Sequence, residues 1–278
     1  MRLIYENERG KVTMHGGGAN GFNITQISGL CIPENDISAV RYPNIAGRVV
    51  TRATPMERVI TISADVSDDN KRYISNALRV FSIPGTVYIT SLGKTKKIKC
   101  RSIAFEPGKK KGSYVPFTLQ LCADYPYFED MYETVTNISK REAELSSPFI
   151  LGCAFSKRLF KNNVINYGDV AIEPVFEISS KEGVACPSGI TIKNLTNGNS
   201  ITLNTDVLAG ETITVDVKKR TITSNLRGNM ISCIAKDTSL SRFVLDVGVS
   251  LVEISAPGTE DKIVSLCRHN NSYASVVI

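Results

Sequence analysis

Alternation of apolar and polar residues dominates the first part of the chain and predicts strands around one helix. Val, Ile, Thr, Tyr and Phe recur with a period of two between glycines and prolines, which is typical of β-strands. The stretch from Ile74 to Phe81 instead has helical spacing, with Ser67 as a polar cap before it and Pro84-Gly85 after it. Strands are expected at residues 58–65, 86–91, 96–105 and 114–122. This order predicts a small sheet or barrel with one packed helix.

The second half of the chain shows short strand-like runs separated by turn signals such as Asn197-Gly198 and Pro257-Gly258. Regularly spaced short strands predict a β-sandwich or jelly roll. The expected runs are residues 170–179, 189–194, 200–203, 211–216, 221–224, 229–233, 241–245, 248–255, 262–268 and 272–277. A helix is one expectation for the polar stretch at 139–144. The fold class is therefore mainly β, with domains at 1–130 and 131–278.

Composition agrees with two folded domains. The chain has 278 residues, of which 42% are hydrophobic and 22% charged, so a packed core is feasible and disorder throughout is not expected. No window approaches the roughly 18 apolar residues of a membrane span, and the first residues lack an apolar signal core. We therefore expect synthesis in a cytosol and no membrane insertion.

The net charge of +6 is concentrated in the first half, where residues 1–130 hold 18 Lys and Arg against 12 Asp and Glu. Lysines alternate with other residues from Lys94 to Arg101, which predicts a strand with a solvated basic face. Three more lysines, Lys109, Lys110 and Lys111, precede Gly112 and suggest an exposed hairpin tip. Aromatic residues for base stacking are sparse there, so specific nucleic-acid binding is not expected.

The glycine-rich segment from His15 to Gly21 matches two motifs by its letters, the dinucleotide fingerprint and the oxyanion loop of lipases. Both need a context that is missing. A β-branched, alternating stretch follows where a dinucleotide site needs a helix, and the chain contains no Gly-x-Ser-x-Gly elbow. A loop between two strands is the favoured interpretation.

Cysteine and histidine also give little material for catalysis. The seven cysteines contain no Cys-x-x-Cys pair, which excludes the usual zinc spacing and favours reduced thiols in the core. Cys267 and His269 share one face of a predicted strand without a third orienting group. Asp124 and Glu129 could form a glycosidase pair, but the chain has no tryptophan for sugar stacking. We expect no enzyme activity, no metal and no cofactor.

Six short segments of the chain form a pattern that is specific in its order and spacing. In the first half they are Arg41-Tyr42-Pro43-Asn44-Ile45-Ala46-Gly47-Arg48, Arg58-Val59-Ile60-Thr61-Ile62 and Asp124-Tyr125-Pro126-Tyr127-Phe128. In the second half they are Asn166-Tyr167-Gly168-Asp169-Val170, Ile190-Thr191-Ile192-Lys193-Asn194 and Ala209-Gly210-Glu211-Thr212-Ile213. Together these segments resemble the distal tail proteins of long-tailed phages, also called siphovirus tail components. Tyr125 departs from the commoner Asp-Pro-Tyr-Phe pattern, and Tyr273 is the only aromatic candidate for the last strands.

The resemblance implies a split-barrel-like first domain that forms a ring, usually of six subunits, and a peripheral galectin-like sandwich. Such a ring joins the tail tube to the tail-tip or receptor-binding proteins in the virion. The expected assembly and partner contacts are Arg41, Gly47, Arg48, Lys96, Lys109, Lys110 and Lys111. Two other functions stay open: a carbohydrate- or receptor-binding protein that acts through the sandwich, and a hydrolase.

Overall fold

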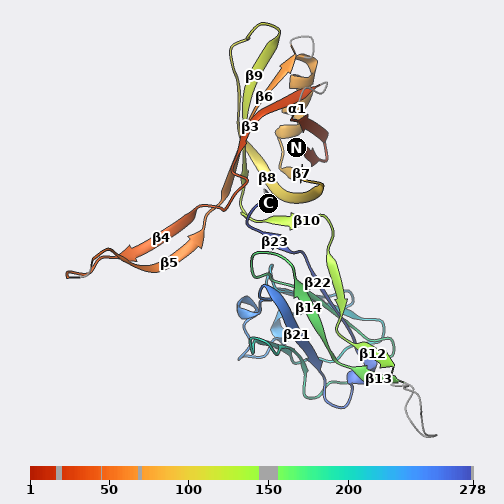
Figure 1. Cartoon of the computed structure of the whole chain (residues 1–278). Helices are drawn as coiled ribbons and strands as arrows, with labels where there is room; N and C mark the ends of the chain where they lie inside the picture. Colours follow the sequence, from red (N-terminus) through yellow and green to blue (C-terminus); the bar gives the residue numbers. More distant parts are fainter. Residues whose placement is uncertain (17–20, 45, 68–70, 144–155, 277–278) are drawn as a thin grey trace, which may run out of the picture. The chain divides into compact units, whose positions relative to one another are not determined.

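The computed structural model describes residues 1–16, 21–44, 46–67, 71–143 and 156–276 (Figure 1). The chain divides into two compact units. We call Met1–Met131 together with Ser272–Ile278 the barrel unit, and Tyr132–Asn271 the sandwich unit. The end of the chain therefore returns to the first unit, whereas the sequence had placed residues 272–277 in the second.

The barrel unit is built on a sheet that closes on itself. Its order is β8-β7-β1-β2-β3-β6-β9, and β8 pairs with β9 to complete the ring. The strands are β1 (Arg2–Asn7), β2 (Gly10–His15), β3 (Phe22–Ser28), β6 (Arg58–Ser67), β7 (Gly85–Ser91), β8 (Lys94–Pro107) and β9 (Tyr114–Ala123). A bulge between Ser102 and Ala104 bends β8, which pairs with β7 along its first half and with β9 along its second.

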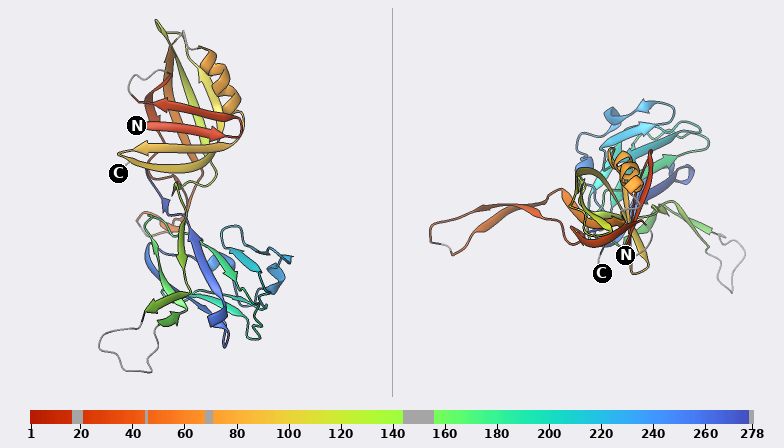
Figure 2. Two further views of the ribbon diagram at one scale, coloured as in Figure 1. Left: turned by 90° about the vertical axis from the view of Figure 1, so that its right-hand side faces the viewer. Right: turned by 90° about the horizontal axis from the view of Figure 1, so that it is seen from above.

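Helix α1 (Lys71–Phe81) packs against this barrel (Figure 2). Ala77, Val80 and Phe81 are buried with the inward side chains of the strands. The ring of Phe81 meets that of Tyr5 edge-on at 5.2 Å, and Ser102 donates a hydrogen bond of 2.6 Å to the Phe81 carbonyl. The helix is confirmed at the position that the apolar spacing predicted. The adjoining residues 68–70 lie outside the described part of the chain.

A separate two-stranded sheet lies between β3 and β6 in the chain. It consists of β4 (Asn35–Val40) and β5 (Val49–Pro55), which pair only with each other. Almost every residue of both strands is exposed, so neither face packs on the barrel. We call this hairpin the arm. The sequence had predicted no strands there, because its residues do not alternate between buried and exposed faces.

The barrel sheet is extended past β8 by β10 (Phe128–Asp130) and β23 (Ser272–Tyr273). Phe128 is opposite Tyr273, and Asp130 is opposite Lys96. Further hydrogen bonds to this returning segment run from Arg58 to the Ala274 carbonyl and from the Val276 amide to the Leu30 carbonyl. These contacts explain why the last residues belong to the barrel unit.

Two antiparallel sheets face each other in the sandwich unit across a shared apolar core. One has six strands: β11 (Thr134–Asn137), β22 (Val264–His269), β15 (Val175–Ser179), β18 (Thr212–Asp216), β19 (Thr221–Ser224) and β20 (Gly228–Asn229). The other has four: β14 (Lys161–Asn166), β21 (Gly248–Ser255), β16 (Ile190–Asn194) and β17 (Ser200–Leu203). Both fold predictions, a mainly β chain and a sandwich in the second half, are confirmed.

Three local predictions are wrong. Residues 140–143 form strand β12 (Lys140–Ala143), which pairs with β13 (Ser156–Leu159), instead of a helix. The expected strands at 229–233 and 241–245 contain the 3-10 turns Ile231–Cys233 and Leu240–Arg242. At the turn Ile231–Cys233, the Asn229 side chain accepts a hydrogen bond from the Ile231 amide, which favours a turn over a strand.

The prediction of core thiols is corrected for one cysteine. Cys100, Cys122, Cys186 and Cys267 are buried, as expected, and Cys233 is half-buried. Cys31 is exposed, because it lies in the irregular segment between β3 and the arm. All six of these thiols are free, and Cys153 lies outside the described residues.

Candidate assembly surfaces

The arm carries exposed apolar side chains and exposed arginines together. Its exposed large apolar residues are Ile37, Val40, Tyr42, Val49 and Val50. Arg41 and Arg48 stand at its distal end, and neither makes an ion pair with a described residue. Gly47 beside them has a φ of +90°, a conformation that favours glycine. Three of the residues predicted as contacts are thus brought together on one projecting element.

The root of the arm is fixed in place by a close packing contact. Gly29 has a φ of +83°, and a side chain there would come within 2.1 Å of the Val59 carbonyl oxygen. Only glycine fits at this point. At the other side of the root, the Met56 amide donates a 2.8 Å hydrogen bond to the Glu34 carbonyl. The arm therefore starts from a defined backbone geometry.

Arg58 is the central side chain of this root, and it is 3% exposed. Its guanidinium donates to the carbonyls of Gly29 at 2.7 Å, Cys31, Pro126 at 2.5 Å and Ala274 at 2.8 Å. It also lies 4.6 Å from the centre of the Phe128 ring. Burial lowers the pKa of Arg58 from its ordinary value, although the group stays charged near neutral pH.

A single buried cation thus joins three segments that are far apart in sequence. They are the start of the arm, the segment that leaves β9, and the returning end of the chain. The acceptors are backbone carbonyls, and the charge is also stabilised by the aromatic ring. The sequence analysis missed this role, since a lone arginine before a strand has no distinguishing pattern.

The second exposed feature is the turn between β8 and β9. Lys111 and Tyr114 exchange two backbone hydrogen bonds, of 2.8 and 3.1 Å, around Gly112 and Ser113. Lys109, Lys110 and Lys111 are all exposed there. We call these three residues the lysine tip. The predicted hairpin tip is therefore present, while its role as a partner contact stays a prediction.

Lys96 differs from the other predicted contacts because its side chain is only 14% exposed. Its ammonium lies 2.5 Å from Asp130 and 3.2 Å from the centre of the Tyr273 ring. Its neighbour Lys97 donates a 3.0 Å hydrogen bond to the Met131 carbonyl. The predicted solvated basic face is thus wrong for these two lysines, which bind β10 and the segment after it. The sequence could not show that acidic and aromatic partners return to this strand.

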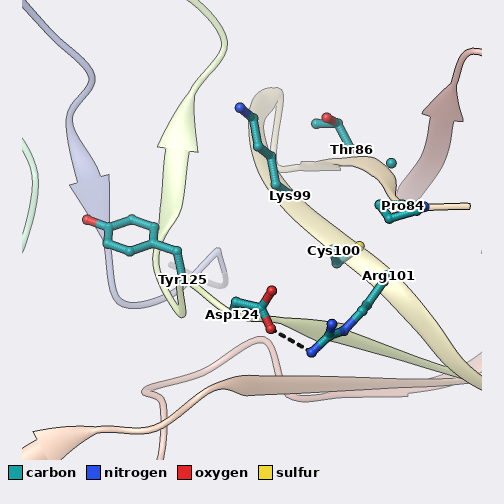
Figure 3. A pocket seen from close by; sticks show the side chains of 8 residues that line it. Pro84, Thr86, Lys99, Cys100, Arg101, Asp124 and Tyr125 are labelled. Atoms are coloured by element: carbon teal, nitrogen blue, oxygen red, sulfur yellow. Dashed lines mark hydrogen bonds and ion pairs between the residues drawn. The ribbon is translucent and has the colours of Figure 1, made fainter. Parts of the chain in front are cut away.

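An open pocket of about 440 Å³ lies where β7 starts (Figure 3). Its lining is Pro84, Gly85, Thr86, Lys99, Cys100, Arg101, Asp124 and Tyr125. Arg101 and Asp124 form a 3.0 Å ion pair at the rim, and both side chains are mostly exposed. Burial raises the pKa of the Cys100 thiol to about 12, so this cysteine is not a thiolate nucleophile at neutral pH.

The candidate catalytic motifs of the sequence do not form a catalytic arrangement. The glycine segment joins β2 to β3, so no helix follows it, and residues 17–20 lie outside the described part. Cys267 and His269 are both buried in β22, and burial raises the Cys267 pKa well above its ordinary value. Among the described residues, no group of three or more His, Cys, Asp or Glu could hold a metal ion.

The sandwich unit has a buried carboxylate, Glu211, in an ion pair with Arg227, whose side chain is 33% exposed. Glu211 is 0% exposed and accepts hydrogen bonds from Arg227 at 2.6 and 2.7 Å. The Leu208 amide donates another at 2.8 Å, and the Ser224 hydroxyl donates a fourth. Although burial alone would raise it, these donors together lower the pKa of Glu211. This arrangement stabilises two neighbouring turns.

Comparison with known proteins gives one family and one fold. Residues 167–264 match the model of the siphovirus-type tail component, C-terminal domain. No curated protein sequence matches the chain. The crystal structure of Dit from phage SPP1, described as a paradigm of the hub adsorption apparatus in phages of Gram-positive hosts, has a TM-score of 0.67 at 12% identity. The match covers 90% of this chain and 93% of that one.

A second solved structure, the phage P2 baseplate in its activated conformation with calcium, is less similar. Its TM-score is 0.49 at 10% identity, over 96% of this chain and 97% of the other. None of the helices in the described residues is long and apolar enough to cross a membrane. The family match and the SPP1 Dit fold together confirm the resemblance predicted from the sequence. Residues 167–264 thus match the siphovirus-type tail component family, and the chain has the fold of SPP1 Dit.

Proposed function

We propose that this chain is a structural adaptor at the distal end of a phage tail, and that the barrel unit assembles into a ring of identical subunits. The observation that carries the proposal is the arm. An isolated two-stranded hairpin is marginally stable in water, and this one exposes both its faces. Its exposed apolar residues have no covering element within the described chain. A partner surface would cover them.

A second copy of the chain is the partner that fits best. The arm projects from one place on the barrel unit and would contact a different place on its neighbour. Such a heterologous contact repeats from one copy to the next, and it closes into a ring when the rotation between neighbours divides a full turn evenly. The related Dit of SPP1 is described as part of a hub, which agrees with this arrangement. Six subunits are the number that the family resemblance implies.

The sandwich unit would lie at the periphery, with the barrel units forming the ring itself. The ring would join the tail tube on one side to tail-tip or receptor-binding proteins on the other, and the lysine tip would contact one of these adjoining proteins. The role is a structural one without catalysis. Its location would be the tail tip of the virion, after synthesis in the cytoplasm of the bacterial host. None of these roles needs a nucleophile or a cofactor.

Light scattering on the purified full chain tests the ring. The wild type should give a mass of several subunits, near six. A variant in which residues 39–50 are replaced by Asn-Gly keeps the arm root and should be monomeric. Its Tm should equal that of the wild type when both are measured at a concentration where the wild type is also monomeric. As a control, Val135→Ser with Leu226→Ser removes exposed apolar residues from the sandwich unit and should leave the mass unchanged. An arm-shortened chain with the wild-type mass would exclude the arm as the contact.

Electron microscopy of tails labelled with an antibody against this chain tests the adaptor role. The label should occur at one end of the tail only. The alternative, a carbohydrate-binding role for the sandwich unit, rests on Tyr167, an exposed aromatic side chain that could stack on a sugar. A glycan array with the wild type and Tyr167→Ser decides this alternative, and we expect no bound glycan. A cell-wall turnover assay of the full chain should likewise show no hydrolysis.

A further inference from the structure

The turn between β7 and β8 places a leucine where this residue is doubly unfavourable. Leu92 and Gly93 form a two-residue loop, with φ values of +49° and +80°. Positive φ at both positions is the requirement of a type I′ turn, which favours Asn, Asp or Gly. Leu92 is also 86% exposed. Its backbone is strained and its side chain is in water.

Strained backbone conformations occur where the surrounding structure or a function maintains them. In this turn asparagine would cost less conformational free energy than leucine. The stability of the fold therefore does not explain why position 92 is a leucine. A second molecule that buries this side chain would explain both features. Apolar anchors of this kind, fully exposed before binding and seated in a pocket afterwards, contribute most of the affinity in many interfaces.

The same chain offers a pocket for such an anchor. The pocket of about 440 Å³ has Pro84, Gly85, Cys100 and the ring of Tyr125 among its lining residues (Figure 3). This volume lies within the roughly 300–1,000 Å³ that is typical of ligand pockets. Its rim carries Asp124, whose side chain is 76% exposed. Lys94, two residues after Leu92, is exposed and makes no ion pair with a described residue.

Leu92 cannot reach this pocket within its own chain. Gly85 pairs with Cys100 at one end of the β7–β8 ladder, and Ser91 pairs with Lys94 at the other. Six steps along a strand, at roughly 3.3 Å each, separate the two ends by about 20 Å. The anchor and the pocket therefore lie at opposite ends of one ribbon. A contact between them must therefore join two molecules, and a head-to-tail repeat of this contact around an axis would close a ring.

We propose that Leu92 of one subunit inserts into the pocket of Pro84, Gly85, Cys100 and Tyr125 of the next subunit, with Lys94 beside Asp124. This contact rests on the proposed self-association and names one interface of it. The apolar side chain supplies the affinity. The Lys94–Asp124 pair fixes the orientation, in exchange for the exposed and individually weak pair of Asp124 with Arg101.

Leu92→Asn separates assembly from folding, because the two should change in opposite directions. Asparagine suits the turn, so the Tm measured at a concentration where the chain is monomeric should stay equal or rise. Loss of a buried leucyl anchor should weaken self-association by about ten- to a hundredfold, as measured by sedimentation over a concentration series. Leu226→Asn removes an exposed leucine from the sandwich unit and serves as the matched control, with no change expected.

The charge pair gives a second and independent test. Lys94→Glu and Asp124→Lys should each weaken self-association about threefold to tenfold at low salt, and the double variant should recover most of the loss. Recovery would not occur if either residue acted alone.

The outcomes separate this proposal from the one on which it rests. A wild type that stays monomeric at every concentration contradicts the ring and this contact together. A wild type that assembles while Leu92→Asn assembles equally well overturns only the Leu92 contact. A double variant no better than either single variant overturns the Lys94–Asp124 pair. A Leu92→Asn chain with a lowered Tm would show that leucine serves the turn itself, which also overturns the proposal.

Discussion

Among the residues that the structure describes, each unit buries one Arg or Glu side chain, and the two units do so in different ways. In the barrel unit, the cation Arg58 binds backbone carbonyls of segments that are 27 to 216 residues away in sequence. In the sandwich unit, the anion Glu211 binds an arginine, a serine and an amide within 16 residues. The first arrangement joins distant parts of the chain, and the second stabilises a local turn. A buried charge can thus stabilise either contacts between distant segments of the chain or the conformation of one loop.

Removal of the anion should have the largest effect. Glu211→Ala leaves the guanidinium of Arg227 and the donors of Leu208 and Ser224 without their acceptor. Breaking a fully buried pair from one side costs roughly 3–5 kcal/mol. Because the Arg227 side chain is 33% exposed and can be partly solvated, the free energy of unfolding of the sandwich unit should fall by the lower half of this range, about 3–4 kcal/mol. Urea unfolding, monitored in the sandwich unit by hydrogen exchange, measures it. A loss spread equally over both units would contradict the local role.

Removal of the cation should cost somewhat less but act over a longer range. Arg58→Met leaves four carbonyls without their donor, and water can reach part of this region, so we expect a loss of about 2–4 kcal/mol from the barrel unit. Hydrogen exchange should accelerate together at the arm root, near Pro126 and in the returning segment. Faster exchange at only one of these places would exclude the joining role. Arg58→Lys, which keeps the charge with fewer donors, should lie in between.

The dependence of stability on acidic pH should differ between the buried groups Glu211 and Arg58. The folded-state pKa of Glu211 is lowered, so its contribution to stability is fully present above the unfolded pKa and is lost as pH falls through the folded value. The sandwich unit should lose stability below about pH 4.5, the ordinary pKa of a glutamate. In Glu211→Gln this part of the pH dependence should disappear. Arg58 stays protonated over this range, so Arg58→Met should leave the acid dependence of the barrel unit unchanged.

The smallest effect is expected at the lysine tip. Replacing Lys109, Lys110 and Lys111 with glutamate should change the Tm very little, because exposed charges are each worth about 1 kcal/mol or less. Attachment to an adjoining tail protein should weaken, and more so at low salt. A shift in the mass of the ring itself would instead place the lysine tip at the contact between subunits.

Most of the fold could be predicted from the sequence because its strands repeat a simple pattern. The strands Ser200–Leu203, Thr221–Ser224 and Gly248–Ser255 begin and end where apolar residues alternate between turn signals. Helix α1 was equally clear from its apolar spacing. Local patterns of this kind depend on one side of the element facing a core, and they determine secondary structure well where burial is regular.

The remaining features depend on contacts that a local pattern does not contain. The arm was missed because both its faces are exposed, and the return of Ser272–Tyr273 was missed because only two residues pair with β10. Lys96 was expected in solvent because its partners Asp130 and Tyr273 are distant in sequence. Arg41, Gly47 and Arg48 were proposed as contacts from the family resemblance. Leu92 could be proposed as a contact only from its positive φ angle, which the structure supplies.

The return of the chain to the barrel unit also determines the order in which the protein can be completed on the ribosome. The sandwich unit is one continuous stretch, Tyr132–Asn271, and it is synthesised before Ser272 and the residues after it exist. The barrel unit begins first but is completed after the sandwich unit, since β23 and the Ala274 carbonyl that Arg58 binds follow Asn271 in the chain. A nascent chain that has not yet passed Ala274 therefore lacks a finished arm root, and it would not yet present a complete arm surface to its neighbours.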